Sequence, residues 1–207
     1  RKTTVLAMVD AAPVTAVALL AATGGFAEAV PGLPSAGPTV AVALPEGLVY
    51  VAGGWGERTP GDAFSPTSAE LFSPSARTFA DITPKLAVPR VYAGAALLAD
   101  GRVIVVGGGG ALGDGAQYKS SEIFNRAAGT YAAGPAMSVA RQAAFAGALP
   151  DGRVLVAGGF PVGPLNPPLS SAEVLDAAAT AFTPAAAQLS PGRGVGSTAQ
   201  LPDGRLL

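Results

Sequence analysis

The chain has 207 residues, of which 49% are hydrophobic and 13% are charged, and its formal net charge at pH 7 is −1. The charges form no basic cluster, so the sequence lacks the electrostatic footprint of a nucleic-acid-binding protein. It contains no His and no Cys, which excludes thiol nucleophiles, His-based catalytic dyads and His or Cys metal ligands within this chain. The 28 glycines and 19 prolines favour many short strands joined by turns.

The first 29 residues differ from the rest of the chain. Arg1 and Lys2 precede an Ala-rich apolar run at 11–22, and Ala27-Glu28-Ala29 has the small residues of a signal cleavage site. We therefore expect 1–29 to be a signal peptide and the protein to be extracellular or periplasmic. The alternative is that 5–10 and 14–21 are outer strands of a structural unit that precedes the repeats. No stretch reaches the ~18 uninterrupted apolar residues that a transmembrane helix needs.

An eleven-residue pattern recurs from position 44 to the end of the chain. Its copies lie at 44–54, 98–108 and 149–159, with a shorter one at 201–207. The turn glycines of the four copies are separated by 54, 51 and 52 residues; they are Gly47, Gly101, Gly152 and Gly204. Self-similarity at this period predicts a repeat architecture whose unit is the four-stranded propeller blade.

Each copy reads as a β-hairpin, which supplies the first two strands, a and b, of a blade. The Asp-Gly or Glu-Gly pair at its centre favours a tight primed turn with positive φ at both central positions. The second apolar run is continuous, so we expect neighbouring blades to cover strand b on both faces. A double glycine ends each strand b, where backbone approaches backbone or φ is positive. These glycines are Gly53, Gly54, Gly107, Gly108, Gly158 and Gly159.

Two further strands, c and d, follow each hairpin after a variable loop. Strand c is expected at 68–72, 120–124 and 171–175, and strand d begins at an aromatic seven residues later: Phe79, Tyr131 and Phe182. The double glycine followed by two aromatics with six residues between them resembles the kelch repeat. The third repeat departs from it with Leu175 in place of the first aromatic, and the second aromatic is never Trp.

The kelch resemblance implies an all-β fold, a β-propeller of about three complete four-stranded blades plus partial blades. The blades would span roughly 32–82, 83–134 and 135–185, with a partial blade at 186–207. Because kelch propellers have six or seven blades, we expect 30–207 to form an open arc, a fragment of a larger ring.

Two charged positions are as periodic as the glycines. An arginine stands eleven residues before each of the last three turn glycines (Arg90, Arg141 and Arg193), and a glutamate lies in each strand c (Glu70, Glu122 and Glu173). Since a partly buried Arg needs a carboxylate, we expect these residues to pair as part of the framework. The alternative is that the arginines surround the central channel and attract an anion.

The loops between strands b and c differ in sequence while the framework repeats, as expected where loops carry recognition. We therefore expect a non-catalytic module that binds a protein or glycan through the face formed by the b–c and d–a loops, without a cofactor or metal. Candidate contacts are Trp55, Glu57, Arg58, Asp62, Asp114, Gln117, Tyr118, Lys119, Phe160 and Asn166. Trp55 and Tyr118 have the large contact area of binding anchors, although Trp55 could instead pack on a neighbouring blade. The rival interpretation is part of a carbohydrate-active enzyme whose catalytic residues lie outside this chain.

Overall fold

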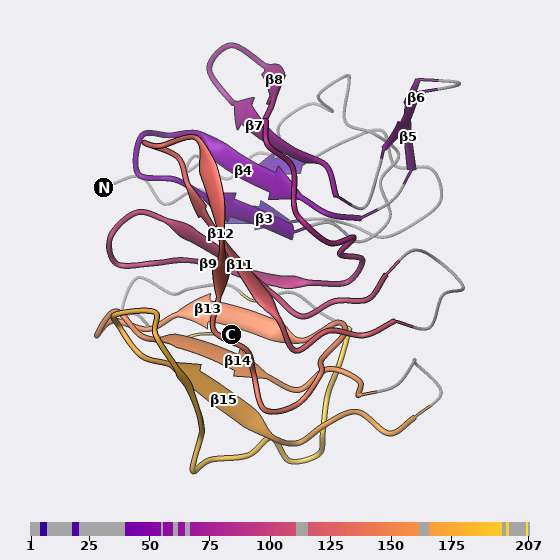
Figure 1. Cartoon of the computed structure of the whole chain (residues 1–207), viewed down its shortest axis with the longest axis vertical. Coiled ribbons are helices and arrows are strands. Elements are labelled where there is room, and N and C mark those ends of the chain that lie inside the picture. Colours follow the sequence, from indigo (N-terminus) through magenta and orange to yellow (C-terminus); the bar gives the residue numbers. More distant parts are fainter. Residues whose placement is uncertain are drawn as a thin grey trace.

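The computed structural model describes residues 40–54, 67–110, 116–161 and 166–195, positions 198 and 206, and the backbone of four short strands at 5–7, 18–20, 56–59 and 62–64. The described residues form β-strands joined by turns and loops, without a helix. Three four-stranded antiparallel sheets follow one another along the chain, and in Figure 1 they succeed one another from top to bottom.

Each sheet is one blade with its strands in sequence order. The first blade consists of β3 (Val40–Ala43), β4 (Val49–Ala52), β7 (Ala69–Ser73) and β8 (Thr78–Asp81). The second consists of β9 (Gly94–Leu97), β10 (Val103–Val106), β11 (Ser121–Asn125) and β12 (Thr130–Gly134). The third consists of β13 (Phe145–Ala148), β14 (Val154–Ala157), β15 (Ala172–Leu175) and β16 (Phe182–Pro184). The fold is therefore all-β, an open arc of propeller blades.

The first strands of the three blades lie side by side, since β3 contacts β9 and β9 contacts β13. This arrangement makes strand a the inner strand of each blade and strand d the outer one. The a–b turns point to one side in Figure 1 and the b–c loops to the opposite side. We call these two sides the turn face and the loop face.

Two short hairpins accompany the blades. β1 (Val5–Ala7) pairs with β2 (Ala18–Leu20) in an antiparallel register, in the two segments for which outer strands were the alternative to a signal peptide. β5 (Gly56–Thr59) and β6 (Asp62–Phe64) form a hairpin within the b–c loop of the first blade. No helix among the described residues is long and apolar enough to cross a membrane.

The a–b turns differ from the primed turns predicted from the sequence, and that prediction is wrong. In the second blade the Gly101 amide donates to the Leu98 carbonyl (3.0 Å) and the Leu98 amide to the Arg102 carbonyl (2.7 Å). Positive φ occurs at Gly101 (85°) but not at Asp100. A three-residue loop with one left-handed glycine satisfies these bonds, so the acidic residue is left in ordinary backbone geometry.

Strand b is covered on both faces, as predicted. All four residues of β10 are buried. Val103 and Val105 pack in a cluster with the first blade, whereas Ile104 and Val106 pack in a cluster with the third. Since successive side chains of a strand point to opposite faces, one continuous apolar run supplies the core on both sides of a blade.

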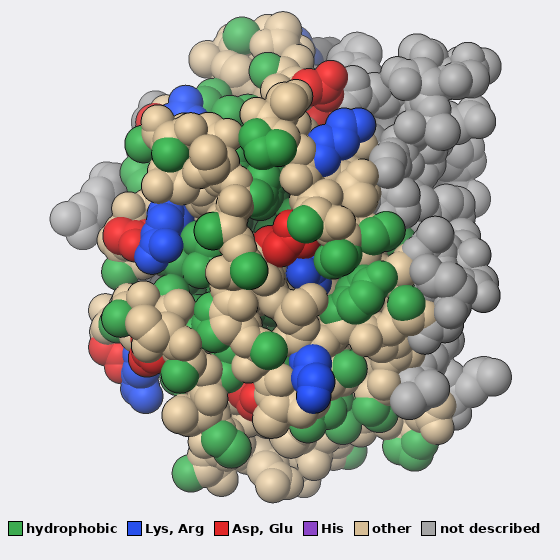
Figure 2. Space-filling model, viewed as in Figure 1, with side chains coloured by type: hydrophobic (Ala, Val, Ile, Leu, Met, Phe, Trp, Pro, Cys, Tyr) green, Lys and Arg blue, Asp and Glu red, His purple; other side chains and the backbone are tan. Residues whose placement is uncertain are grey.

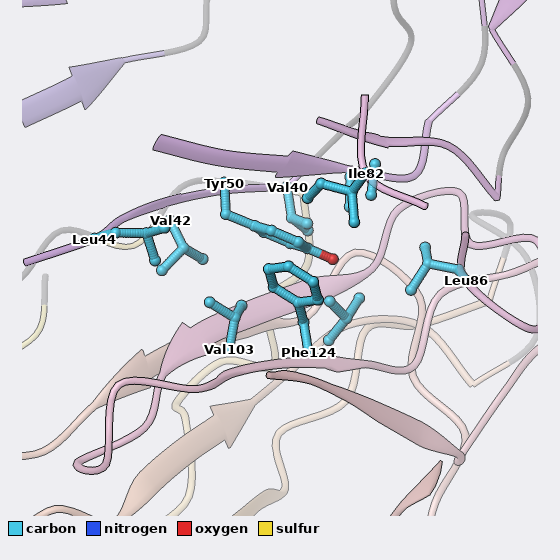
Figure 3. Packing of buried hydrophobic residues seen from close by; sticks show 11 residues of the cluster. Val40, Val42, Leu44, Tyr50, Ile82, Leu86, Val103 and Phe124 are labelled. Atoms are coloured by element: carbon cyan, nitrogen blue, oxygen red, sulfur yellow. The ribbon is translucent and has the colours of Figure 1, made fainter. Parts of the chain in front are cut away.

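The aromatic positions of the repeat pair across strands c and d; those of the second blade lie between the first two sheets, whereas Phe72 and Phe79 cluster with residues of the first blade. Phe72 faces Phe79 and Phe124 faces Tyr131 as directly opposed cross-strand pairs, with ring centroids 4.7 and 4.9 Å apart. Tyr50 of the first blade stacks on Phe124 at 5.3 Å, and Figure 3 shows the two rings one above the other across the junction. Such pairs add to the stability gained from area burial alone. Tyr50, Phe124 and Tyr131 therefore join the aliphatic residues that pack the first blade against the second.

The double glycines bring neighbouring blades into backbone contact. Gly53 and Gly54 both have positive φ, and the Gly54 amide donates to the carbonyl of Arg90 in the next blade at 2.9 Å. A Cβ on Gly53 would collide with that same carbonyl oxygen. The equivalent bonds join Gly108 to Arg141 and Gly159 to Arg193. Glycine is required at these positions for two reasons: the backbones of two blades approach closely, and the backbone is left-handed.

Candidate functional site

Two of the three periodic arginines, Arg90 and Arg141, form buried ion pairs within their own blades. Arg90 Nε lies 2.9 Å from Glu122 Oε1, and Arg141 Nη2 lies 3.2 Å from Glu173 Oε1. Both arginine side chains are 1% exposed. Burial lowers the pKa of the Arg90 guanidinium from its usual value, and the Glu122 carboxylate opposes that shift. The expected Arg–Glu pairing is confirmed for these two blades.

Each arginine also satisfies the end of its own b–c hairpin. Arg141 Nη1 donates to the carbonyls of Gly158 (2.9 Å) and Ser171 (2.8 Å), and Nη2 donates to Ser171 Oγ (2.9 Å). Arg90 makes the same bonds to Gly107 and Ser120. The planar donor fork of Arg suits this set of fixed oxygens, which a Lys ammonium could not match.

The glutamates hold the d–a loops in turn. Glu122 Oε2 accepts the Ala87 amide at 2.6 Å, and Glu173 Oε2 accepts the Ser138 amide at 2.7 Å. Each Arg–Glu unit thereby links strand c, the start of the b–c loop and the d–a loop on the loop face. Glu70 of the first blade is also buried, at 1% exposure. This hydrogen-bonded network fixes the ends of the variable b–c loops.

Arg193 differs from Arg90 and Arg141. Its carbonyl accepts the Gly159 amide at 2.7 Å, as in the other blades, but its side chain is exposed. It forms no ion pair with any residue that the structure describes. Arg193 therefore makes the backbone hydrogen bond to the double glycine that Arg90 and Arg141 make, but not their buried ion pair.

The loop face carries periodic backbone strain beside the arginines. Tyr92, Ala143 and Val195 have positive φ values of 56°, 54° and 59°. The Tyr92 carbonyl accepts the Ala143 amide (2.8 Å), and the Ala143 carbonyl accepts the Val195 amide (3.2 Å). These bonds join consecutive blades and hold the non-glycine residues in left-handed geometry, which costs roughly 1–3 kcal/mol for each residue. Strain of this kind concentrates at functional sites.

Tyr118 lies over the Arg90 guanidinium, with the Arg90 Cζ atom 5.6 Å from the ring centroid. The Tyr118 side chain is half-buried, and its amide donates to the Gly108 carbonyl at 2.9 Å. The residue at the same place in the third blade is Leu169, whose amide donates to Gly159. Tyr118 is therefore held by a cation–π contact to the framework, with part of its surface on the loop face.

Polar groups surround Tyr118 in the same b–c loop. Lys119 is exposed, and Gln117 is half-buried with a side-chain oxygen that has no hydrogen-bond partner among the described residues. A buried acceptor without a partner is costly unless a donor reaches it. Asn166, in the b–c loop of the third blade, is exposed. Trp55 and the Arg58 side chain lie outside the described residues; the backbone of Arg58 belongs to β5.

On the turn face, charged side chains of the a–b turns form ion pairs with one another. Asp100 pairs with Arg102 and Asp151 with Arg153, each at 2.7 Å. The hydrogen bond from Arg102 lowers the pKa of Asp100, and that from Arg153 lowers the pKa of Asp151. In Figure 2 acidic and basic side chains stand next to one another along the edge where the a–b turns lie. These ion pairs belong to the hairpins themselves.

Two polar contacts at the junction of the first two blades do not follow from the repeat pattern. The Tyr50 and Tyr131 hydroxyls lie 2.8 Å apart, and Glu46 pairs with Arg126. Each contact involves a departure from the repeat: Tyr131 replaces the Phe of the other repeats, and Arg126 has no counterpart. These departures were visible in the aligned copies, but only the fold brings the two partners together.

Among the described residues no group of three or more Asp and Glu could hold a metal ion. No known protein family and no curated protein matches the sequence. The fold resembles the solved structure of YjhT, with a TM-score of 0.68 at 15% sequence identity over 89% of this chain. The matched region spans 62% of the YjhT chain. A likeness at this identity shows the fold alone: this chain has a propeller-like arrangement of antiparallel blades.

Proposed function

We propose that the chain is a non-catalytic binding module of kelch type, exported to the periplasm or the cell exterior, that recognises a protein or glycan through the loop face. The observation that carries the proposal is the contrast between the two faces. On the turn face the charges of the a–b hairpins are paired, Asp100 with Arg102 and Asp151 with Arg153 within one hairpin and Glu46 with Arg126 across two blades. On the loop face an aromatic ring, an exposed cation and an unsatisfied acceptor adjoin one another in one loop.

The framework beneath this loop is rigid because the buried Arg90–Glu122 pair and its neighbouring backbone bonds fix it. Tyr118 is held over Arg90, so presenting its ring to a ligand costs little conformational entropy. The unpaired oxygen of Gln117 offers an acceptor to a hydroxyl or amide donor. An aromatic surface beside hydrogen-bonding groups suits either a sugar ring or a polar protein surface.

The test uses Tyr118→Leu, which installs the residue that the third blade carries at Leu169 and therefore preserves the packing. We expect it to weaken a ligand found on an array of glycans and secreted proteins by ~1–3 kcal/mol, that is, roughly 5- to 150-fold. Combining it with Trp55→Ala tests the second predicted anchor. The matched control is Asp151→Ala with Arg153→Ala, which removes an ion pair of the turn face and should leave binding unchanged. Normal binding by the Tyr118 variants, or loss of binding in the control, would contradict the loop-face proposal.

A further inference from the structure

A cleft of about 470 Å³ lies between the first and second blades. One wall is the outer part of the first blade, with Leu71 and Ile82, and the other is the end of β11 and the turn that follows it, with Phe124 and Gly129. None of the lining residues belongs to the b–c loops, so the cleft is distinct from the surface proposed above. Its charged groups are Glu46, Asp81 and Arg126.

The acidic residue of the outer strand departs from the repeat. Asp81 of β8 lies directly opposite Glu70. In the same register the second blade has Ala133 and the third has Pro184. The framework therefore does not require a carboxylate at this position, and the charge is specific to the junction that contains the cleft.

The basic residue departs from the repeat as well. Arg126 follows the last residue of β11, where the first and third blades carry Pro74 and Ala177. Its partner Glu46 is available because Leu48 stands in the first hairpin where the later hairpins have an arginine. In the first hairpin the acidic residue therefore pairs with an arginine on the other side of the cleft, whereas in the later hairpins it pairs with an arginine of the same hairpin.

We propose that this cleft binds a small neutral sugar. Glu46 and Asp81 can accept hydrogen bonds and Arg126 can donate them, and each hydroxyl group of a sugar can both donate and accept. The charged groups of the cleft sum to one negative charge, which disfavours a free anion. Leu71 and Ile82 supply an apolar wall for the C–H face of the ring, and the volume accommodates a hexose.

The experiment titrates the isotopically labelled chain with glucose, galactose and mannose and follows the backbone amide resonances by NMR. We expect saturable shifts for at least one hexose at the amides of Asp81, Arg126 and Gly129. The Asp81→Ala/Arg126→Ala variant, which copies Ala133 and Ala177 from the other repeats, should bind about tenfold or more weakly because charged hydrogen bonds are lost. Glucuronate, the anionic probe, should bind more weakly than the neutral sugar because the cleft has a net negative charge.

Three outcomes would overturn the proposal: no saturable shift with any neutral hexose, an unchanged affinity in the double variant, or tighter binding of glucuronate. If the double variant does not fold, Asp81→Asn and Arg126→Gln, measured separately, give the same readout. Tyr118→Leu, which changes the loop face, should leave hexose binding in the cleft unaffected. Failure here and failure of the loop-face proposal are therefore distinguishable.

Discussion

At the scale of single residues, the buried arginines are the strongest determinants of the framework. Arg90 and Arg141 each bind a glutamate, two backbone carbonyls and a serine hydroxyl while excluded from water. A buried ion pair is weak evidence of net stabilisation, but removal of one member leaves the other charge buried alone. The consequence of losing an arginine therefore depends on whether its glutamate is present.

Arg141→Met tests this dependence, with Arg193→Met as its matched control. We expect the Arg141 variant to lower the free energy of unfolding by ~3–5 kcal/mol, because Glu173 would be left uncompensated. The Arg193 side chain is exposed, so its replacement should change stability by about 0.5 kcal/mol or less. Urea unfolding followed by circular dichroism measures both. Equal effects of the two substitutions would show that the ion pair is not what stabilises the blade.

The glycines at the blade junctions give a second prediction at this scale. A Cβ at Gly107 would collide with the Arg141 carbonyl oxygen, whereas a Cβ at Gly101 would meet no atom within 4 Å. Both glycines have positive φ, so alanine at either position carries the ~1–2 kcal/mol cost of left-handed backbone. Gly107→Ala should be the more destabilising of the two in thermal unfolding, since it also separates two blades. A smaller loss for Gly107→Ala than for Gly101→Ala would contradict the close-approach explanation.

At the scale of elements, the junction between the first two blades contains a buried hydroxyl pair. Burial raises the pKa of Tyr50 well above its usual value, and burial also raises that of Tyr131. Above about pH 10 the tyrosines of the unfolded chain lose protons while these two keep theirs. The folded state then binds more protons than the unfolded state, so stability falls as the pH rises. Below pH 10 the contribution is fully present.

Urea unfolding between pH 8 and pH 11 measures this effect. We expect the free energy of unfolding to decline above pH 10 by up to about 1.4 kcal/mol per pH unit for each protected tyrosine. Replacing both tyrosines with Phe should remove most of the decline in unfolding free energy over this pH range. Tyr131→Phe alone, which installs the residue of the other repeats, should make the decline less steep without abolishing it. An identical profile in the double variant would show that other groups cause the alkaline loss.

At the scale of the whole molecule, strand b of the second blade packs against both neighbouring blades, whereas its outer strand d has no fully buried residue. All residues of β10 are buried between two neighbouring blades, whereas every residue of β12 is exposed or half-buried. Local opening is easiest where few apolar contacts are lost. In native-state hydrogen exchange the amides of β10 should open with free energies near the global value, and those of β12 with lower ones. Equal protection of the two strands would indicate that each blade opens only as a unit.

The sequence alone determined the strands of the repeat, because each copy has the same residue types at the same positions. Continuous apolar runs placed strand b in the core, double glycines located the backbone contacts, and the matched arginines and glutamates indicated ion pairs. The a–b turns were misjudged because Asp-Gly suits more than one turn type, and the hydrogen bonds of the flanking residues select between them. The variability of the b–c loops indicates which surface carries recognition, but it does not predict how the side chains of those loops are arranged.

Only the tertiary structure decided which residues meet across blades. Tyr50 and Tyr131 are 81 positions apart, and Glu46 and Arg126 are 80 apart, so no local pattern joins them. The position of Tyr118 over Arg90 likewise follows from the path of a loop that the repeat does not encode. Repeats specify the bonds that every unit makes, since the same residues recur with the same neighbours. Contacts made by residues that depart from the repeat depend on how the finished blades stack, and the cleft between the first two blades arises there.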